Sequence, residues 1–226
     1  EYTSTNLMFP GVAAGYPASV TREIALTEIA AHGGTIAEIR RTPEGWRTVI
    51  GSPYNRRLTA DTPMQITGPA AGHARLHTSD DPAGARVLGT LNNCAGGITP
   101  WGTYLMAEEN INGNFLGALP FGHPEAENHN RMGVPGGRYQ WGRYLDRFDV
   151  SKEPNEPNRF GWIVEVDPKD PASTPKKRTA LGRFKHEGAE SVVAPDGRVV
   201  IYCGDDQRFD YVYKFVTRGR FVPGDR

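Results

Sequence analysis

A single cysteine, Cys94, lies one short predicted strand away from a pair of acidic residues. It sits in an Asn-Asn-Cys-Ala-Gly-Gly loop, and the strand-like run 101–107 separates that loop from Glu108, Glu109 and Asn110. A strand of this length places the loops at its two ends within one hairpin. A thiolate favours transition metals, whereas carboxylate and amide oxygens suit calcium and ferric iron. The segment could therefore supply ligands to a mixed-metal site.

Further acidic residues follow short predicted strands downstream. Glu187 comes directly after His186, and Asp205 and Asp206 follow a run of Val and Ile. Paired aspartates at a strand end are common calcium ligands and equally common turn residues, so the residue types leave both roles open. Adjacent strand residues point to opposite faces. We therefore expect only one residue of the Glu108-Glu109 pair to face a metal, and a supporting or structural role for His186.

Several other classes of function lack their motifs. The sequence has no His-Glu-x-x-His zinc motif, no Gly-x-Ser-x-Gly elbow, no phosphate-binding loop that ends in Gly-Lys-Ser/Thr, and no Asp-x-Asp-x-Asp-Gly calcium loop. Its 26 basic and 26 acidic residues balance to a formal charge of +0. This balance gives no support for a nucleic-acid-binding surface or for binding to a membrane surface. No apolar run approaches the length of a membrane span.

The elements that must position these residues are predicted to be short strands. Hydrophobic residues make up only 38% of the 226 residues, and 27 Gly and 18 Pro favour many turns. Strands are predicted at 35–40, 46–50, 87–91, 101–107, 159–166, 178–184, 191–194, 198–202 and 211–217. The first two form a hairpin. With no helices alternating between them, these strands indicate a β-propeller or a sandwich.

A few segments are predicted to depart from this strand pattern. Residues 18–29 could form a helix with Ser19 or Thr21 as its N-cap. Residues 112–158 read as a long loop insertion, in which 140–148 could be a short helix. The run 176–178, Lys-Lys-Arg, is expected on a solvated turn. The two cysteines, Cys94 and Cys203, could pair as a disulfide, which competes with the metal interpretation of Cys94.

Three groups of residues resemble the motifs of PhoX-type alkaline phosphatases. The first is Asn92-Asn93-Cys94-Ala95-Gly96-Gly97 with Thr99-Pro100-Trp101-Gly102-Thr103 and Glu108-Glu109-Asn110. The second is Gly182-Arg183-Phe184-Lys185-His186-Glu187. The third is Tyr202-Cys203-Gly204-Asp205-Asp206 with Tyr213-Lys214-Phe215-Val216. Residues 7–217 follow the family order. The resemblance implies hydrolysis of phosphomonoesters by a cluster of Fe³⁺ and Ca²⁺ with a bridging oxo group, at the mouth of an all-β, six-bladed propeller.

The resemblance also implies roles for particular residues. It makes Cys94, Glu109 and Glu187 iron ligands, and Asp206 a calcium ligand, with Asp205 and Glu108 as further candidates for the metals. Glu109, Glu187 and Asn110 are expected to act in catalysis, the asparagine by orienting a carboxylate or touching phosphate. These roles would make small-molecule phosphomonoesters the substrates.

The resemblance carries expectations about the whole protein as well. Family members are longer, so residues 1–226 are expected to be the N-terminal part of one propeller domain that needs the remaining half, including further arginines and acidic ligands. A monomer is expected, exported by the twin-arginine route to the periplasm, the cell surface or the medium. Two alternatives are a calcium-dependent propeller lactonase or phosphotriesterase and a non-catalytic binding propeller. Neither needs a cysteine ligand.

Overall fold

Six short strands form the largest sheet of the computed structural model, which describes residues 5–12 and 15–224. In spatial order they are β6 (Arg86–Leu88), β5 (Pro63–Thr67), β10 (Lys176–Arg178), β9 (Ile163–Val166), β8 (Tyr104–Glu108) and β7 (Asn93–Ile98). Strands β7 to β10 form an antiparallel meander in chain order. Strand β5 joins β10 in parallel, and β6 pairs with β5. The meander contains Cys94, and Glu109 comes directly after β8.

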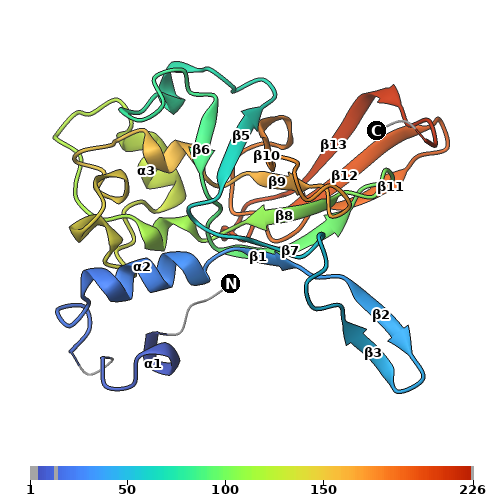
Figure 1. Ribbon diagram of the computed structural model, residues 1–226. Coiled ribbons are helices and arrows are strands. Elements are labelled where there is room, and N and C mark those ends of the chain that lie inside the picture. The colour runs from blue at the N-terminus through green and yellow to red at the C-terminus, as the bar shows by residue number, and fades with distance from the viewer. Residues whose placement is uncertain (1–4, 13–14, 225–226) are drawn as a thin grey trace.

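A second antiparallel meander of three strands follows in the chain. It consists of β11 (Glu190–Val193), β12 (Arg198–Gly204) and β13 (Val212–Arg220). Two further pairs are β1 (Gly34–Ile36) with β4 (Arg56–Leu58), and β2 (Ile39–Thr42) with β3 (Gly45–Thr48). The β2–β3 hairpin, predicted from the sequence, projects from the body of the molecule (Figure 1). The coarse prediction of an all-β fold is confirmed, although the described residues form no closed ring of blades.

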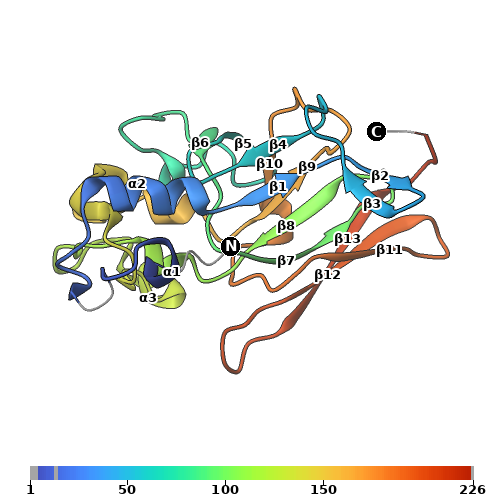
Figure 2. The same ribbon diagram turned by 60° about the horizontal axis from the view of Figure 1, so that its bottom comes forward.

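The helices are few and short. They are α1 (Thr5–Met8), α2 (Arg22–Ala31) and α3 (Ala126–Met132), and they lie at the end of the molecule away from the three-stranded sheet (Figures 1 and 2). The helix predicted near the N-terminus is confirmed as α2. One of its two predicted N-caps is also confirmed, since the Thr21 hydroxyl accepts the Ile24 N–H at 3.3 Å. Among the described residues, no helix has both the length and the apolar character needed to cross a bilayer.

The insertion 112–158 is ordered around buried aromatic side chains. It holds α3 and the 3₁₀ turns η3 (Ile111–Asn114), η4 (Trp141–Arg143), η5 (Asp146–Phe148) and η6 (Glu156–Arg159). Trp141 and Phe115 pack on Phe148, with ring centroids 5.0 and 5.7 Å apart. The prediction of one helix over 140–148 is wrong. Gly142 packs so closely on the Phe148 carbonyl, 2.6 Å from where a Cβ would lie, that the segment folds back on itself.

The solvated turn predicted at 176–178 and the strand predicted at 178–184 are also wrong. Residues 176–178 form β10, an interior strand of the sheet between β5 and β9, and the Lys177 side chain is fully buried. The chain then enters the 3₁₀ turn η7 (Thr179–Leu181), in which the Thr179 hydroxyl donates to the Thr67 carbonyl at 2.7 Å. Gly182, at φ +87°, ends that turn. Another short turn is η2 (Ala74–Leu76).

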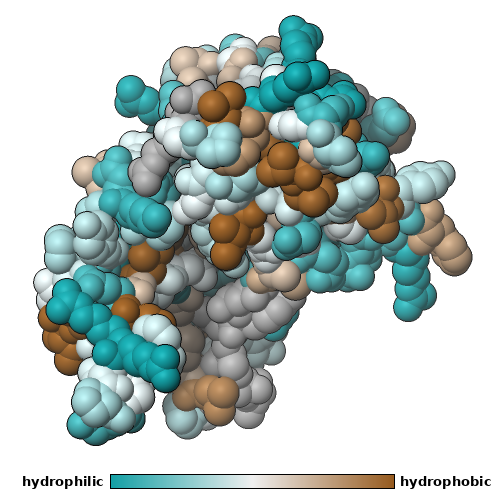
Figure 3. Space-filling view, turned by 90° about the vertical axis from the view of Figure 1, so that its right-hand side faces the viewer, coloured by the Kyte–Doolittle hydropathy of each residue, from teal (hydrophilic) through white to brown (hydrophobic). Residues whose placement is uncertain are grey.

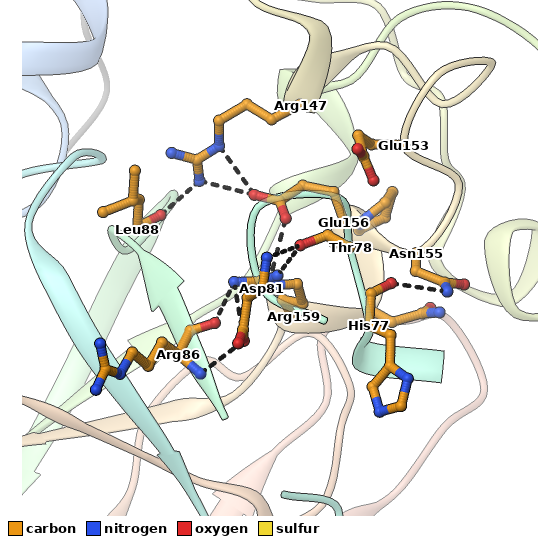
Figure 4. A network of polar contacts seen from close by, with 12 residues as sticks. His77, Thr78, Asp81, Arg86, Leu88, Arg147, Glu153, Asn155, Glu156 and Arg159 are labelled. Atoms are coloured by element: carbon orange, nitrogen blue, oxygen red, sulfur yellow. Dashed lines mark hydrogen bonds and ion pairs between the residues drawn. The ribbon is translucent and has the colours of Figure 1, made fainter. Parts of the chain in front are cut away.

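The outer edge of β6 is closed by side chains rather than by another strand (Figure 4). Arg159 and Arg147 donate to the carbonyls of Arg86 and Leu88, and Asp81 accepts the Arg86 N–H at 2.8 Å. Buried Glu156 lies between the two arginines, 2.8 Å from Arg147 and 3.3 Å from Arg159. Capping the polar groups of an edge strand in this way discourages pairing with another chain.

Two apolar cores hold the elements together. The larger one packs α2 and the insertion 112–158 against the six-stranded sheet. The smaller one joins the two meanders through side chains of β8, β9 and β12, among them Leu105, Ile163 and Ile201. Because this smaller core fixes β12 beside β8, it brings the segment before β11, which contains Glu187, close to Cys94.

Candidate metal centre

A bulge in β7 sets the direction of Cys94. Asn93 pairs with Glu108 and Gly96 pairs with Met106, so Cys94 and Ala95 together oppose the single residue Ala107. Such an extra residue bends the strand and re-aims its side chains. The preceding Asn92 has φ +49°, a conformation that Asn tolerates better than most other residues.

Three of the predicted ligands converge. The Cys94 thiol donates to Glu187 Oε2 at 3.1 Å, and one ligand atom each from Cys94, Glu109 and Glu187 lies within 4.8 Å of the others. Two ligands of one ion, each at about 2.0–2.6 Å, lie at most about 5 Å apart. One sulfur and two carboxylates at this spacing therefore fit a single cation. Glu109 is buried, whereas Cys94 and Glu187 are partly exposed.

Backbone hydrogen bonds dock the three ligand segments against one another. The Ala95 N–H donates to the Glu187 carbonyl at 2.9 Å, and the Glu187 N–H donates to the Gly204 carbonyl at 3.1 Å. The Glu109 N–H donates to the Asn92 carbonyl at 3.2 Å. The ligands thus come from three segments, the β7 bulge, the end of β8 and the approach to β11, each tied by its main chain.

Asn110 contacts the group without belonging to it. Its side-chain amide donates to Glu109 Oε1. It therefore orients one carboxylate, which is one of the two roles predicted for it from the resemblance.

Glu108 lies outside the group, in the interior. Its carboxylate is fully buried and accepts hydrogen bonds from five donors, which come from Thr90, Leu91, Gly161, Trp162 and Lys177. The expectation that it contributes directly to the metals does not fit this placement, because both oxygens are already engaged by donors. The alternation of strand side chains did predict that only one of the two glutamates faces the ligands.

Lys177 is a buried residue near the site that no sequence pattern singles out. Its ammonium group lies 2.8 Å from Glu108 Oε1 and donates to the Arg159 carbonyl at 3.0 Å. Burial lowers the pKa of Lys177 to about 8, and the nearby Glu108 carboxylate opposes that shift. Three consecutive basic residues usually indicate a solvated turn, and no local pattern marks the central one as buried.

His186 is buried beside the candidate ligands. Its ring packs on Phe184, and Nε2 lies 3.1 Å from the Gly182 carbonyl. Burial lowers the pKa of His186 to about 4, so the ring is neutral at pH 7. These contacts agree with the predicted structural role.

Asp205 and Asp206 also lie outside the group of three. The Asp205 carboxylate is 2.9 Å from Arg131 Nη2 and accepts the Gln207 N–H at 3.0 Å. Asp206 is exposed, and its N–H donates to the Lys185 carbonyl at 3.0 Å, two residues before Glu187. The disulfide alternative is wrong, because no disulfide bond joins Cys94 and Cys203.

Two comparisons with known proteins give matches. The family model described as alkaline phosphatase PhoX matches residues 1–226. A solved structure, Pseudomonas fluorescens PhoX in complex with vanadate, a transition state analogue, is similar with a TM-score of 0.85 and 46% identity. The match covers 90% of this chain and 35% of that chain, so this chain spans about a third of its length. No curated protein matches significantly.

Proposed function

The chain belongs to the PhoX alkaline phosphatase family, and we propose that it forms part of a metal-dependent phosphatase that releases inorganic phosphate from phosphomonoesters. The observation that best supports this proposal is the convergence of Cys94, Glu109 and Glu187 within 4.8 Å. A thiol and two carboxylates at this spacing offer one soft and two hard ligand atoms to a cation.

We propose that these three residues hold ferric iron and that Asp206 contributes to a neighbouring calcium site. Bound cations of this kind neutralise the charge that spreads over the phosphate oxygens during transfer. The chain's own residues prepare the site. The β7 bulge aims Cys94, Asn110 fixes one oxygen of Glu109, and burial keeps that carboxylate away from water. The thiol proton now shared with Glu187 is the one that metal binding would displace.

We also propose that the chain is the N-terminal part of a β-propeller domain, with 112–158 as an insertion. The meander β7 to β10 followed by the meander β11 to β13 supports consecutive blades. The three-stranded sheet leaves Val192, Tyr202 and Val212 exposed. Figure 3 shows apolar side chains among hydrophilic ones on that side of the molecule. These are surfaces that further blades would cover.

Substrates and location follow from the same proposal. Small phosphomonoesters are the proposed substrates, the monomer is the proposed state, and a site outside the cytoplasm is the proposed location. A cysteine ligand favours the phosphatase over the calcium-dependent lactonase and over a binding propeller, because neither of these needs a sulfur ligand such as Cys94.

The test is an initial-rate assay with p-nitrophenyl phosphate on the complete protein, as wild type and as Glu109→Gln. Loss of a residue that only supports a metal ligand can lower activity by roughly 100-fold. Loss of the ligand itself should lower kcat/KM by at least as much. Glu44→Gln, at an exposed turn of the β2–β3 hairpin, is the matched control and should retain the wild-type rate. An unchanged rate in Glu109→Gln would rule out this residue as a ligand of the reacting centre.

A further inference from the structure

We propose that Glu108 is a positioning residue that holds all three candidate ligands in register without binding the metal. This inference rests on the proposed function, because it gives Glu108 a role toward the Cys94, Glu109 and Glu187 site. Its carboxylate is fully buried between the meander and the loops that precede Cys94 and β9.

Five donors fix the Glu108 carboxylate in one orientation. Oε1 accepts from the Thr90 hydroxyl at 2.8 Å, the Leu91 N–H at 3.2 Å and the Lys177 ammonium at 2.8 Å. Oε2 accepts the N–H groups of Gly161 and Trp162 at 3.0 and 3.1 Å. A carboxylate can accept about four hydrogen bonds along its lone pairs, so this one is saturated.

The first connection leads to Cys94. The Thr90 hydroxyl, which donates to Glu108, also accepts the Asn93 side-chain amide at 2.7 Å. Asn93 directly precedes Cys94, and the Leu91 N–H is held by the same carboxylate. Glu108 therefore fixes the loop from which the β7 bulge emerges.

The other two connections run through the main chain. Glu109 is the next residue, so the direction of its side chain depends on how the strand end is held. The Glu108 carbonyl accepts the His186 N–H at 3.0 Å, directly before Glu187. One residue thus connects the backbone positions of all three ligands.

The chemistry of the position requires a carboxylate. In Glu108→Gln the volume is kept, but one acceptor oxygen becomes an NH₂ group that faces N–H or N⁺–H donors. Lys177, fully buried, would lose its charge partner. The loops before Cys94 and β9 would then shift to recover hydrogen bonds.

Glu165 provides a matched control in the same meander. It is a buried carboxylate on β9 that accepts from Trp101 Nε1 at 2.8 Å and from the Thr103 hydroxyl at 2.6 Å. Like Glu108, it pairs with a cation of β10, in this case Arg178. Glu165→Gln therefore reproduces the loss of a buried charge while leaving the segments of the three ligands alone.

The experiment titrates ferric citrate into the full chain and follows the thiolate-to-iron absorption band, with bound iron measured in parallel. Glu108→Gln should weaken iron binding by about 10- to 100-fold and shift the band, as loss of outer-shell partners does. Glu165→Gln should remain within about threefold of wild type, because its partners Trp101, Thr103 and Arg178 are not partners of Glu108 or of the three ligands. Cys94→Ala should abolish the band.

The outcomes separate the two proposals. If Glu108→Gln binds iron like wild type while Cys94→Ala does not, the positioning role is overturned and the metal site stands. If wild type gives no cysteine-dependent band, the proposed metal site fails, and the role of Glu108 fails with it. Should Glu108→Gln not fold, Thr90→Val decides, because it removes the hydroxyl that links Glu108 to Asn93 and leaves the other four donors to the carboxylate in place. A normal band and affinity in that variant would also overturn the inference.

Discussion

At the scale of single residues, Glu108 and Glu109 show what a sequence can and cannot predict. They are adjacent and chemically identical, and strand alternation correctly predicts that they face opposite ways. Glu108 points inward toward donors that include Lys177, which lies 69 positions away and is brought in by the pairing of β10 with β9 and with β5. The residues around Glu108 do not reveal that partner. The choice of Glu109 as the metal ligand therefore comes from the family resemblance and not from the spacing.

His32 is another buried titratable residue, and it makes the free energy of unfolding depend on pH. Its Nδ1 lies 2.8 Å from the Glu28 carbonyl, and Nε2 lies 3.5 Å from the Asn114 amide. Tyr139 and Trp141 pack against the ring edge-on. Burial lowers the pKa of His32 to about 4, so the folded chain keeps the ring neutral where the unfolded chain protonates it.

The sign of the effect follows from that lowered pKa. The contribution of His32 is fully present above pH 6.5 and is lost as the pH falls toward 4, because only the unfolded state takes up the proton. Between pH 7.5 and pH 5 the wild type should lose about 2 kcal/mol of unfolding free energy through this residue. Urea unfolding at both pH values, on wild type and His32→Gln, measures the difference. An identical pH dependence in the two proteins would contradict the assignment.

At the scale of elements, the site depends on the close contact between β7 and the segment before β11. A Cβ on Gly97 would lie 1.9 Å from the Ala189 carbonyl oxygen, so only glycine permits this contact. The hydrogen bond from Ala95 to Glu187 lies along the same contact. The sequence predicted the hairpin 35–50, helix α2 and most strands, because each follows from local alternation or capping. It missed β4, β5 and β10, it treated the β7 segment around Cys94 as a loop, and it missed the turns in 140–148, because these conformations depend on distant packing.

The variant Gly97→Ala tests whether this close contact positions the ligands. The added methyl group should push the segment 187–190 away from β7, separate Glu187 from Cys94 and lower stability by about 2 kcal/mol, as overpacking does. Iron binding should fall with it. Gly219→Ala, where no atom lies within 4 Å, is the control and should behave like wild type. Thermal unfolding together with bound iron measures both effects, and wild-type iron binding in Gly97→Ala would show that the approach does not position the ligands.

At the scale of the whole molecule, the two meanders and the apolar core between them create the site. Cys94 belongs to the first meander, Glu187 leads into the second, and the core of Leu105, Ile163 and Ile201 fixes one against the other. The sequence motifs indicate the family, and the family model over residues 1–226 confirms it. They could not predict the order β6-β5-β10-β9-β8-β7, because the parallel pairing of β5 with β10 joins segments far apart in the chain.

The proposed function depends most directly on whether Cys94 anchors iron. Elemental analysis of iron and calcium in the purified complete protein, for wild type and Cys94→Ala, tests this in one measurement. We expect iron together with excess calcium in wild type, and loss of iron but not of fold in Cys94→Ala. Calcium alone, unchanged by the substitution, or no metal in either protein, would contradict the cysteine-anchored iron site.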